Sequence, residues 1–266
     1  MSIRREVSAQ VRLAIPLAAQ QLGLVLMGLV DTAMLGRYHA DAMAGAGIGN
    51  ALFFAVTCIG LGVLLGLDPL LNQAIGAGER WRTPGLVADG VAVAVRLGAV
   101  LSLAIMATPL LLSVAGVEPA VADEARVFAY ARVPGVIPFL VQLAYRGALQ
   151  AHGRTRPLVV AVVAGNIANA ALDLPMIFGW RALGIPPMGA MGSALATSFV
   201  TILTTLYFAG AFRLIAHELP APPSPAPPKR PPAARALLRV GAPIGLQLAA
   251  EVGAFALASV LAGRLG

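Results

Sequence analysis

The stretch VRLAIPLAAQQLGLVLMGLVDTAMLGR, residues 11–37, decides the fold of this chain. It is a mostly apolar run, long enough to cross a bilayer as one helix, for which about 20 residues are needed. Within it lies Asp31, and a carboxylate inside such a helix costs roughly 2.5–3.5 kcal/mol on insertion scales. A side chain this costly usually faces a protein interior or a watery cavity. We therefore expect the rest of the chain to form further helices around Asp31.

The composition predicts an all-α membrane protein. The chain is 58% hydrophobic and only 12% charged, whereas soluble domains carry about 25% charged residues. Its apolar runs are continuous, unlike the short alternating strands of a membrane β-barrel. About seven transmembrane helices are predicted, at residues 13–36, 46–71, 88–113, 127–149, 157–179, 188–212 and 241–263.

The basic residues predict the orientation in the bilayer, because positive loops stay in the cytoplasm. With a cytoplasmic N-terminus, twelve basic residues fall on the inner side: Arg4, Arg5, Arg12, Arg80, Arg82, Arg154, Arg156, Arg213, Lys229, Arg230, Arg235 and Arg239. Five fall on the outer side, namely Arg37, Arg126, Arg132, Arg181 and Arg264. The net charge of +7 is thus a topology signal rather than a nucleic-acid footprint, and no nucleic-acid partner is expected.

A parallel repeat divides the chain. RLAIPLAAQ from Arg12 aligns without a gap on RVGAPIGLQ from Arg239. The two copies lie in the first and the seventh predicted helices, six helices apart along the chain, so both copies run in the same direction, as in the parallel repeats of transporters. We predict a six-helix N-terminal lobe (1–217), a proline-rich cytoplasmic linker (218–238) and the first helix of a second lobe (239–266). The remainder of that lobe is expected from the same polypeptide or from a second chain.

Polar residues within the spans predict a cavity. Asp31 and Asp173 lie near the outer ends of two helices that both run outward, so we expect the two acids at similar depth. Asn166, Asn169 and Asp173 share one helix face, as do Gln20 and Asp31. We see no basic residue at the depth of the two acids, and such acids can exchange protons near neutral pH. The alternative interpretation is that these groups form interhelical hydrogen bonds that hold the bundle together.

The seventh segment carries a second candidate site. Glu251 lies near its middle, one turn from Gln247, and is a candidate cation or proton site unless it pairs with further helices. In the fourth segment, Pro134 and Pro138 predict a kink, because proline removes a backbone hydrogen bond. Enzyme chemistry is not indicated, since no histidine has metal-ligand spacing and no nucleophile has a nearby intramembrane base. We expect no resident metal and no cofactor.

Several motifs resemble those of the multidrug and toxic compound extrusion (MATE) family, in particular its bacterial NorM-like branch. They are P-x14-DTAMLG (16–36), GLDPLLNQAIGAGE (66–79), YRGALQAHGRTRP (145–157), NIANAALDLPMIFG (166–179) and GAMGSALATS (189–198). The resemblance implies two six-helix lobes around a central cavity. It also implies export of organic cations in exchange for protons or sodium ions.

The resemblance assigns roles to individual residues. Asp31 corresponds to the family's first-helix acid, and Asp173, with Asn169 one turn before it, to the fifth-helix acid of proton-coupled members. Glu251 corresponds to the seventh-helix acid of sodium-coupled members. H⁺ and Na⁺ both remain open as the coupling ion, with Na⁺ expected at Glu251 or Asp31. Gln20, Asn166 and Gln247 are expected to line the cavity.

The sequence therefore predicts a multidrug efflux antiporter in a bacterial inner membrane. It would bind cationic drugs and alternate the access of its cavity between the two sides. Two alternatives stay open. A lipid or polysaccharide flippase of the same superfamily would need a more basic cavity, and a truncated chain of this kind could be a membrane protein without transport activity.

Overall fold

The computed structural model describes residues 3–114, 116–221, 223 and 233–265, with side chains for 18–110, 112, 116–221, 223 and 234–251. The regular secondary structure of this part of the chain is helical, apart from an isolated β-bridge between Trp180 and Ile185. The helices are α1 (Ile3–Tyr38), α2 (Ala40–Leu65), α3 (Leu67–Gly76), α4 (Thr83–Ala107), α5 (Pro109–Val114), α6 (Pro119–Arg132), α7 (Val136–Ala151), α8 (Arg156–Phe178), α9 (Gly189–Glu218) and α10 (Ala233–Leu265), with 3-10 turns at Arg80–Arg82, Val133–Gly135 and Arg181–Leu183.

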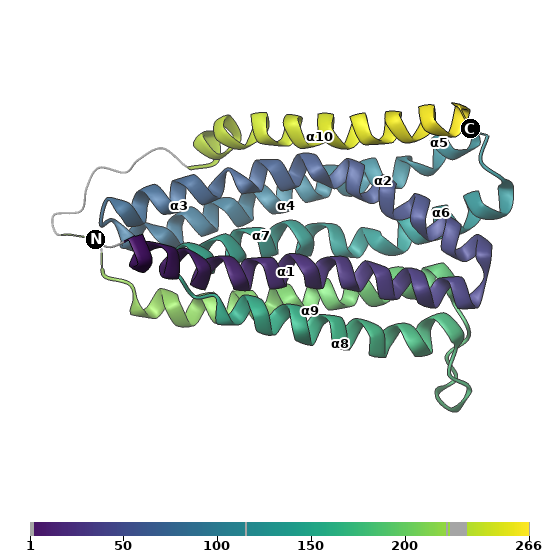
Figure 1. Ribbon diagram of the computed structural model, residues 1–266, viewed down its shortest axis with the longest axis horizontal. Helices are drawn as coiled ribbons and strands as arrows, with labels where there is room; N and C mark the ends of the chain where they lie inside the picture. The colour runs from purple at the N-terminus through teal and green to yellow at the C-terminus, as the bar shows by residue number, and fades with distance from the viewer. Residues whose placement is uncertain (1–2, 115, 222, 224–232, 266) are drawn as a thin grey trace.

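The helices lie side by side along one axis (Figure 1). α10 runs along one face of the bundle against α2, while α8 and α9 form the opposite face with α1 beside α8. The expected linker falls partly on residues 222 and 224–232, which lie outside the described residues. α9 continues to Glu218 and α10 begins at Ala233, so the helix expected from residue 239 begins six residues earlier.

Three of the expected spans are each built from two consecutive helices. Gly66 separates α2 from α3, Thr108 separates α4 from α5, and a 3-10 turn separates α6 from α7. The last break confirms the kink predicted at Pro134, which lies in that turn and has no N–H to continue the helix. Pro138 lies in the first turn of α7, where a backbone N–H has no intrahelical partner in any case.

Hydroxyl groups of α9 bind the backbone on both sides of this break. The Ser198 hydroxyl lies 3.1 Å from the carbonyl oxygen of Ala131, and the Thr205 hydroxyl lies 2.9 Å from that of Pro138. Within a membrane a carbonyl freed by a helix break has no water to bind, so neighbouring Ser and Thr side chains take that role. Each hydroxyl also lies 2.8 Å from a carbonyl oxygen one turn earlier in α9, so it donates its proton to one of two acceptors at a time.

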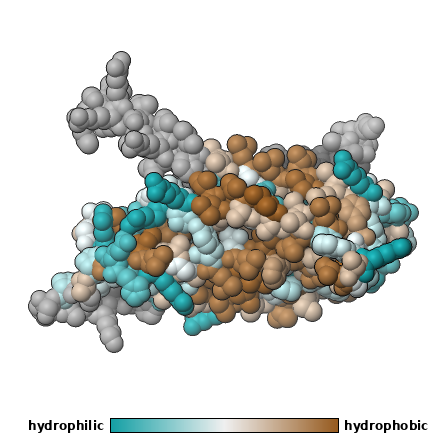
Figure 2. All heavy atoms as spheres, turned by 90° about the horizontal axis from the view of Figure 1, so that it is seen from below, coloured by the Kyte–Doolittle hydropathy of each residue, from teal (hydrophilic) through white to brown (hydrophobic). Residues whose placement is uncertain are grey.

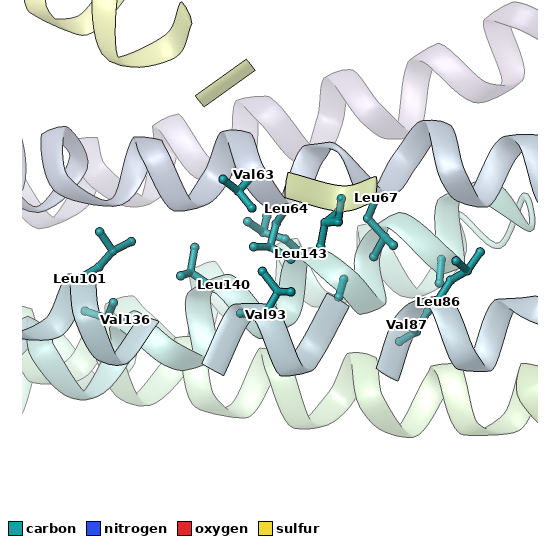
Figure 3. Packing of buried hydrophobic residues seen from close by; sticks show 14 of the residues in the cluster. Val63, Leu64, Leu67, Leu86, Val87, Val93, Leu101, Val136, Leu140 and Leu143 are labelled. Carbon is teal, nitrogen blue, oxygen red and sulfur yellow. The ribbon is translucent and has the colours of Figure 1, made fainter. Parts of the chain in front are cut away.

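The largest apolar core lies between α2, α3, α4 and α7. Figure 3 shows Leu64 and Leu67 from the first pair of helices directed toward Val93 and the α7 leucines Leu140 and Leu143. Leu64, Leu67 and Leu140 are at most 1% exposed. Lipid tails are as apolar as leucine, so close packing contacts, rather than transfer out of water, hold these helices together.

The surface of the bundle is strongly apolar. Leu103, Leu110 and Leu214 are each more than 65% exposed. Figure 2 shows such side chains gathered in a broad band, with hydrophilic side chains at both ends of the molecule. In the described residues, six helical segments are long and apolar enough to cross a membrane. The chain is a multi-pass membrane protein.

Glycines bring α10 against α2. Gly62 and Gly66 of α2 face Gly245 and Gly241 of α10, and a Cβ on Gly62 would overlap the backbone of Gly245. A Cβ on Gly241 would likewise overlap the backbone of Val63. Two glycines spaced four apart on each helix are a common means of close backbone contact in membranes. The contact fixes α10 against α2, on the surface of the bundle.

His152 connects the end of α7 to the start of α4 by a hydrogen bond, at the end of the bundle where α1 begins. It follows α7, and its Nε2 lies 3.1 Å from the hydroxyl oxygen of Thr83, the first residue of α4. Burial, together with repulsion from the guanidinium groups of Arg80 and Arg154, lowers the pKa of His152 below its ordinary 6.5. The imidazole is thus neutral in the folded protein at physiological pH.

We predict that this histidine makes the protein less stable in mild acid. Above pH 6.5 the ring is neutral in both the folded and the unfolded chain, so its contribution is complete. As the pH falls below 6.5, His152 takes up a proton in the unfolded chain more readily than in the folded chain, and stability is lost. Between pH 7.5 and 5.5 the Tm of the wild type should fall more than that of His152→Gln. Equal shifts in the two proteins would rule out this role.

Candidate functional site

Close helix contacts place α1, α8 and α9 around one polar cluster. A Cβ on Gly23 of α1 would overlap Val162 of α8, and a Cβ on Gly192 of α9 would overlap the backbone of Met176 in α8. Small residues at such contacts let membrane helices approach closely. The approach brings Asp31 of α1, Asp173 of α8 and Thr197 of α9 together, which makes one site from three distant parts of the chain.

Thr197 is the centre of this site. Its hydroxyl oxygen lies 3.3 Å from Oδ2 of Asp31 and 2.9 Å from the carbonyl oxygen of Ser193 in its own helix. The hydroxyl has one proton and donates it to one of these two acceptors at a time. The side-chain amide of Asn169 donates to the same hydroxyl oxygen over 3.5 Å. Thr197 therefore joins the polar residues of α1, α8 and α9.

The carboxyl groups of Asp31 and Asp173 lie close enough to form a side-chain hydrogen bond. Such a bond requires a proton on one of the two acids, because a carboxylate has no proton to donate. When both are ionised, Oδ1 of Asp31 and both oxygens of Asp173 have no donor among the described residues. The same holds for Oδ1 of Asn169, and the Ser193 hydroxyl likewise has no partner there.

This set of oxygens defines what the site can bind. Asp173 is fully buried and Asn169 is 1% exposed. A buried polar atom without a partner typically costs about 1–3 kcal/mol. A proton between the two acids, or a small cation held by several of these oxygens, would offset that cost. The arrangement is suited to reversible binding of H⁺ or of a cation.

One expectation about this site is wrong. Arg132 was expected on the outer side of the membrane, and the two acids were expected to have no basic residue at their depth. Instead Arg132 is buried, with its guanidinium 4.2 Å from the centre of the Phe53 ring, and its charge attracts that of Asp31. The reason is that α6 begins at Pro119, well before the expected span, which places Arg132 nearly four turns into the bundle.

Comparison with known proteins decides the family. The MatE family model matches residues 16–174, which is more than half of the chain. The chain belongs to the MATE family. Over 96% of its length it is 33% identical to "Probable multidrug resistance protein NorM" of Bradyrhizobium diazoefficiens, of which it covers 54%. The resemblance drawn from the motifs is thereby confirmed.

Solved structures show that the fold is that of MATE transporters. The eukaryotic MATE transporter AtDTX14 superposes with a TM-score of 0.84 at 20% identity, covering 97% of this chain and 56% of that one. The Vibrio cholerae MATE transporter VcmN in its bent form superposes with a TM-score of 0.77 at 18% identity, covering 96% of this chain and 56% of that one. The expected all-α membrane fold is confirmed. The chain spans about half the length of the relatives that it matches.

Within this MATE fold, two of the expected cavity residues lie along α1 and α8 away from the acids. Asn166 donates its side-chain amide to the carbonyl oxygen of Val162, 2.8 Å away in its own helix. It also lies beside Gly23 of α1. Gln20 is buried, and its eleven-residue distance from Asp31 amounts to about 16 Å along the helix. Asn169 is therefore the predicted amide that the fold links to Asp31 through Thr197, and it lies one turn before Asp173 on α8.

Gln247 and Glu251 lie elsewhere in the MATE fold. They are exposed on α10, where the Gln247 amide donates to a carboxylate oxygen of Glu251 over 3.1 Å. α10 packs chiefly on α2, and α2 and α4 lie between α10 and α1 in Figure 1. Glu251 thus belongs to a second polar position, apart from the carboxyl pair.

Sequence reasoning did not select Thr197, Ser193 or Arg132. Threonine and serine in a membrane helix usually bind a carbonyl one turn earlier, as Thr197 also does. The sequence alone therefore does not distinguish a Ser or Thr that belongs to a binding site from one that does not. The signal for Arg132 was present, because Pro119 is a helix-start residue 13 positions before it.

Proposed function

We propose that these residues form one lobe of a multidrug efflux antiporter, which exports organic cations in exchange for H⁺ or Na⁺ by alternating access. The second lobe would come from the same polypeptide or from a second chain, and α10 would be its first helix. The proposal is carried by the Asp31–Asp173 carboxyl pair, buried inside a lobe with the MATE fold. The NorM name of the Bradyrhizobium relative supports drugs as the substrates.

The chemistry of the pair favours H⁺ over Na⁺. Two carboxylates at hydrogen-bonding distance repel each other strongly unless a proton lies between them. A proton from outside would bind there and displace the cationic drug, while loss of the proton to the cytoplasm would restore the negative charge that attracts the next drug. Exclusive occupancy links the two affinities reciprocally. Thr197 and Asn169 would hold the pair in place during this exchange.

We propose a bacterial inner membrane and a cytoplasmic N-terminus. With Arg132 inside the bundle, the outer side retains four basic residues, against twelve on the inner side. The positive-inside rule therefore supports this orientation. A flippase for anionic headgroups is not favoured, because the two acids of the site outnumber its one arginine.

A gradient experiment tests both the transport and the ion. The native protein is reconstituted into liposomes that contain trapped DNA, and entry of ethidium is followed by fluorescence with the membrane potential clamped. An acid interior should drive ethidium entry, and a sodium-loaded interior at equal pH should not. Entry driven by sodium alone would overturn the choice of proton. Failure of both gradients, relative to protein-free liposomes, would overturn the antiporter.

A further inference from the structure

Arg132 is a buried charge that the proposed exchange does not use. It is 8% exposed, and its Nε and Nη1 atoms have no hydrogen-bond partner among the described residues. None of the ion pairs among these residues includes it. Burying a charge without such partners is costly, so other contacts of Arg132 must offset part of that cost.

Three features of the fold stabilise the guanidinium. It lies 4.2 Å from the centre of the Phe53 ring, within the range of a cation–π interaction. It is the last residue of α6, where the helix dipole favours a cation. The negative charge of Asp31 also attracts the guanidinium. All three keep the charge in place without a direct ion pair, so Asp31 remains available to other ligands.

Arg132 lies beside the site, because the carbonyl oxygen of its neighbour Ala131 is 3.1 Å from the hydroxyl of Ser198, the residue after Thr197. The net charge here follows from Asp31, Asp173 and Arg132. Residues 13–36 of α1, 42–65 of α2, 157–178 of α8 and 190–212 of α9 contain Asp31 and Asp173 as their only Asp, Glu, Lys or Arg. With both acids ionised and Arg132 positive, the site carries one negative charge. One shared proton makes it neutral, and one singly charged cation does the same.

We propose that Arg132 tunes this site to singly charged cations. A dication would leave one positive charge uncompensated in surroundings of low dielectric constant, which is costly. Removing the charge of Arg132 leaves two negative charges, and a dication then fits. This inference rests on the proposed function and adds the charge class of the substrate.

Ethidium and propidium provide a matched pair of probes, because they share a phenanthridinium ring and carry one and two positive charges. In acid-inside liposomes of the native protein, entry of ethidium should exceed that of propidium by about tenfold, the factor expected from a modest difference in binding energy. In Arg132→Met the ratio should fall by about tenfold, because the uncompensated charge is gone. Arg132→Lys, which keeps the charge, should retain the wild-type ratio.

Phe53→Leu is the structural control, since it removes the ring packed on Arg132 but keeps the guanidinium, so the dye ratio should stay closer to the wild type than in Arg132→Met. A purely structural role for Arg132 would slow both dyes equally in Arg132→Met and leave the ratio unchanged, which overturns the inference. If Arg132→Met does not accumulate in membranes, Arg132→Gln replaces it. The wild type is informative without any variant, because equal entry of both dyes also overturns the inference. If neither dye enters the liposomes, the proposed function is overturned, and this inference is overturned as well.

Discussion

Replacement of Asp31 by asparagine in the native protein should abolish ethidium transport while leaving membrane insertion intact. Asparagine keeps the size of the side chain and can still accept the hydrogen bond from Thr197. It cannot take up a proton or supply a negative charge. Loss of one partner from a buried charged group typically costs about 3–5 kcal/mol, which corresponds to a rate loss of roughly 10²- to 10⁴-fold. Asp173→Asn should have the same effect, because neither acid can share a proton with an amide.

The two acids act as one unit, so their effects should not add. The rate of the double variant Asp31→Asn/Asp173→Asn should equal that of either single variant, as for other residues that share one role. The rates are measured in acid-inside liposomes, with equal protein content checked by blotting. Asp123→Asn is the control, since this exposed acid pairs with Arg126 at the surface and such pairs contribute about 0–1 kcal/mol. Ethidium transport retained by Asp31→Asn would contradict the assignment of the carboxyl pair.

The helices and the two acids of the site were predictable because both depend on patterns within single segments. A carboxylate in an apolar run is conspicuous, and two helices of equal direction place Asp31 and Asp173 at similar depth. Contacts between segments are harder to predict. Thr197 costs nothing to insert into a membrane, so its position against Asp31 follows only from the packing of α9 on α8 and α1.

Helix boundaries explain the error at Arg132. The apolar window predicted the span from residue 127, which left Arg132 near the membrane surface. The helix begins at Pro119 instead and passes through a polar first turn before it reaches the apolar region. Hydropathy locates the apolar part of a helix but not its start, and here the difference of eight residues moves a charge into the bundle, beside the site.

Substitution of Gly23 by alanine should slow ethidium transport by about tenfold without touching any ligand of the site. A Cβ at this position overlaps Val162, a β-branched side chain with little freedom to move. Overpacking of this kind typically costs about 1–3 kcal/mol. The strain is relieved by moving α1 away from α8, and this movement separates Asp31 from Asp173.

The same helix provides a matched control, and the partner helix provides a rescue. A Cβ on Gly28 meets nothing within 4 Å, so Gly28→Ala makes the same chemical change on α1 and should leave the rate unchanged. Adding Val162→Ala to Gly23→Ala removes the overlapping methyl group and should restore most of the transport. If Gly23→Ala and Gly28→Ala transport ethidium equally well, close contact between α1 and α8 does not position the carboxyl pair. If the rate falls and the double variant recovers it, the distance between these two helices governs the site, because the rescue replaces neither acid.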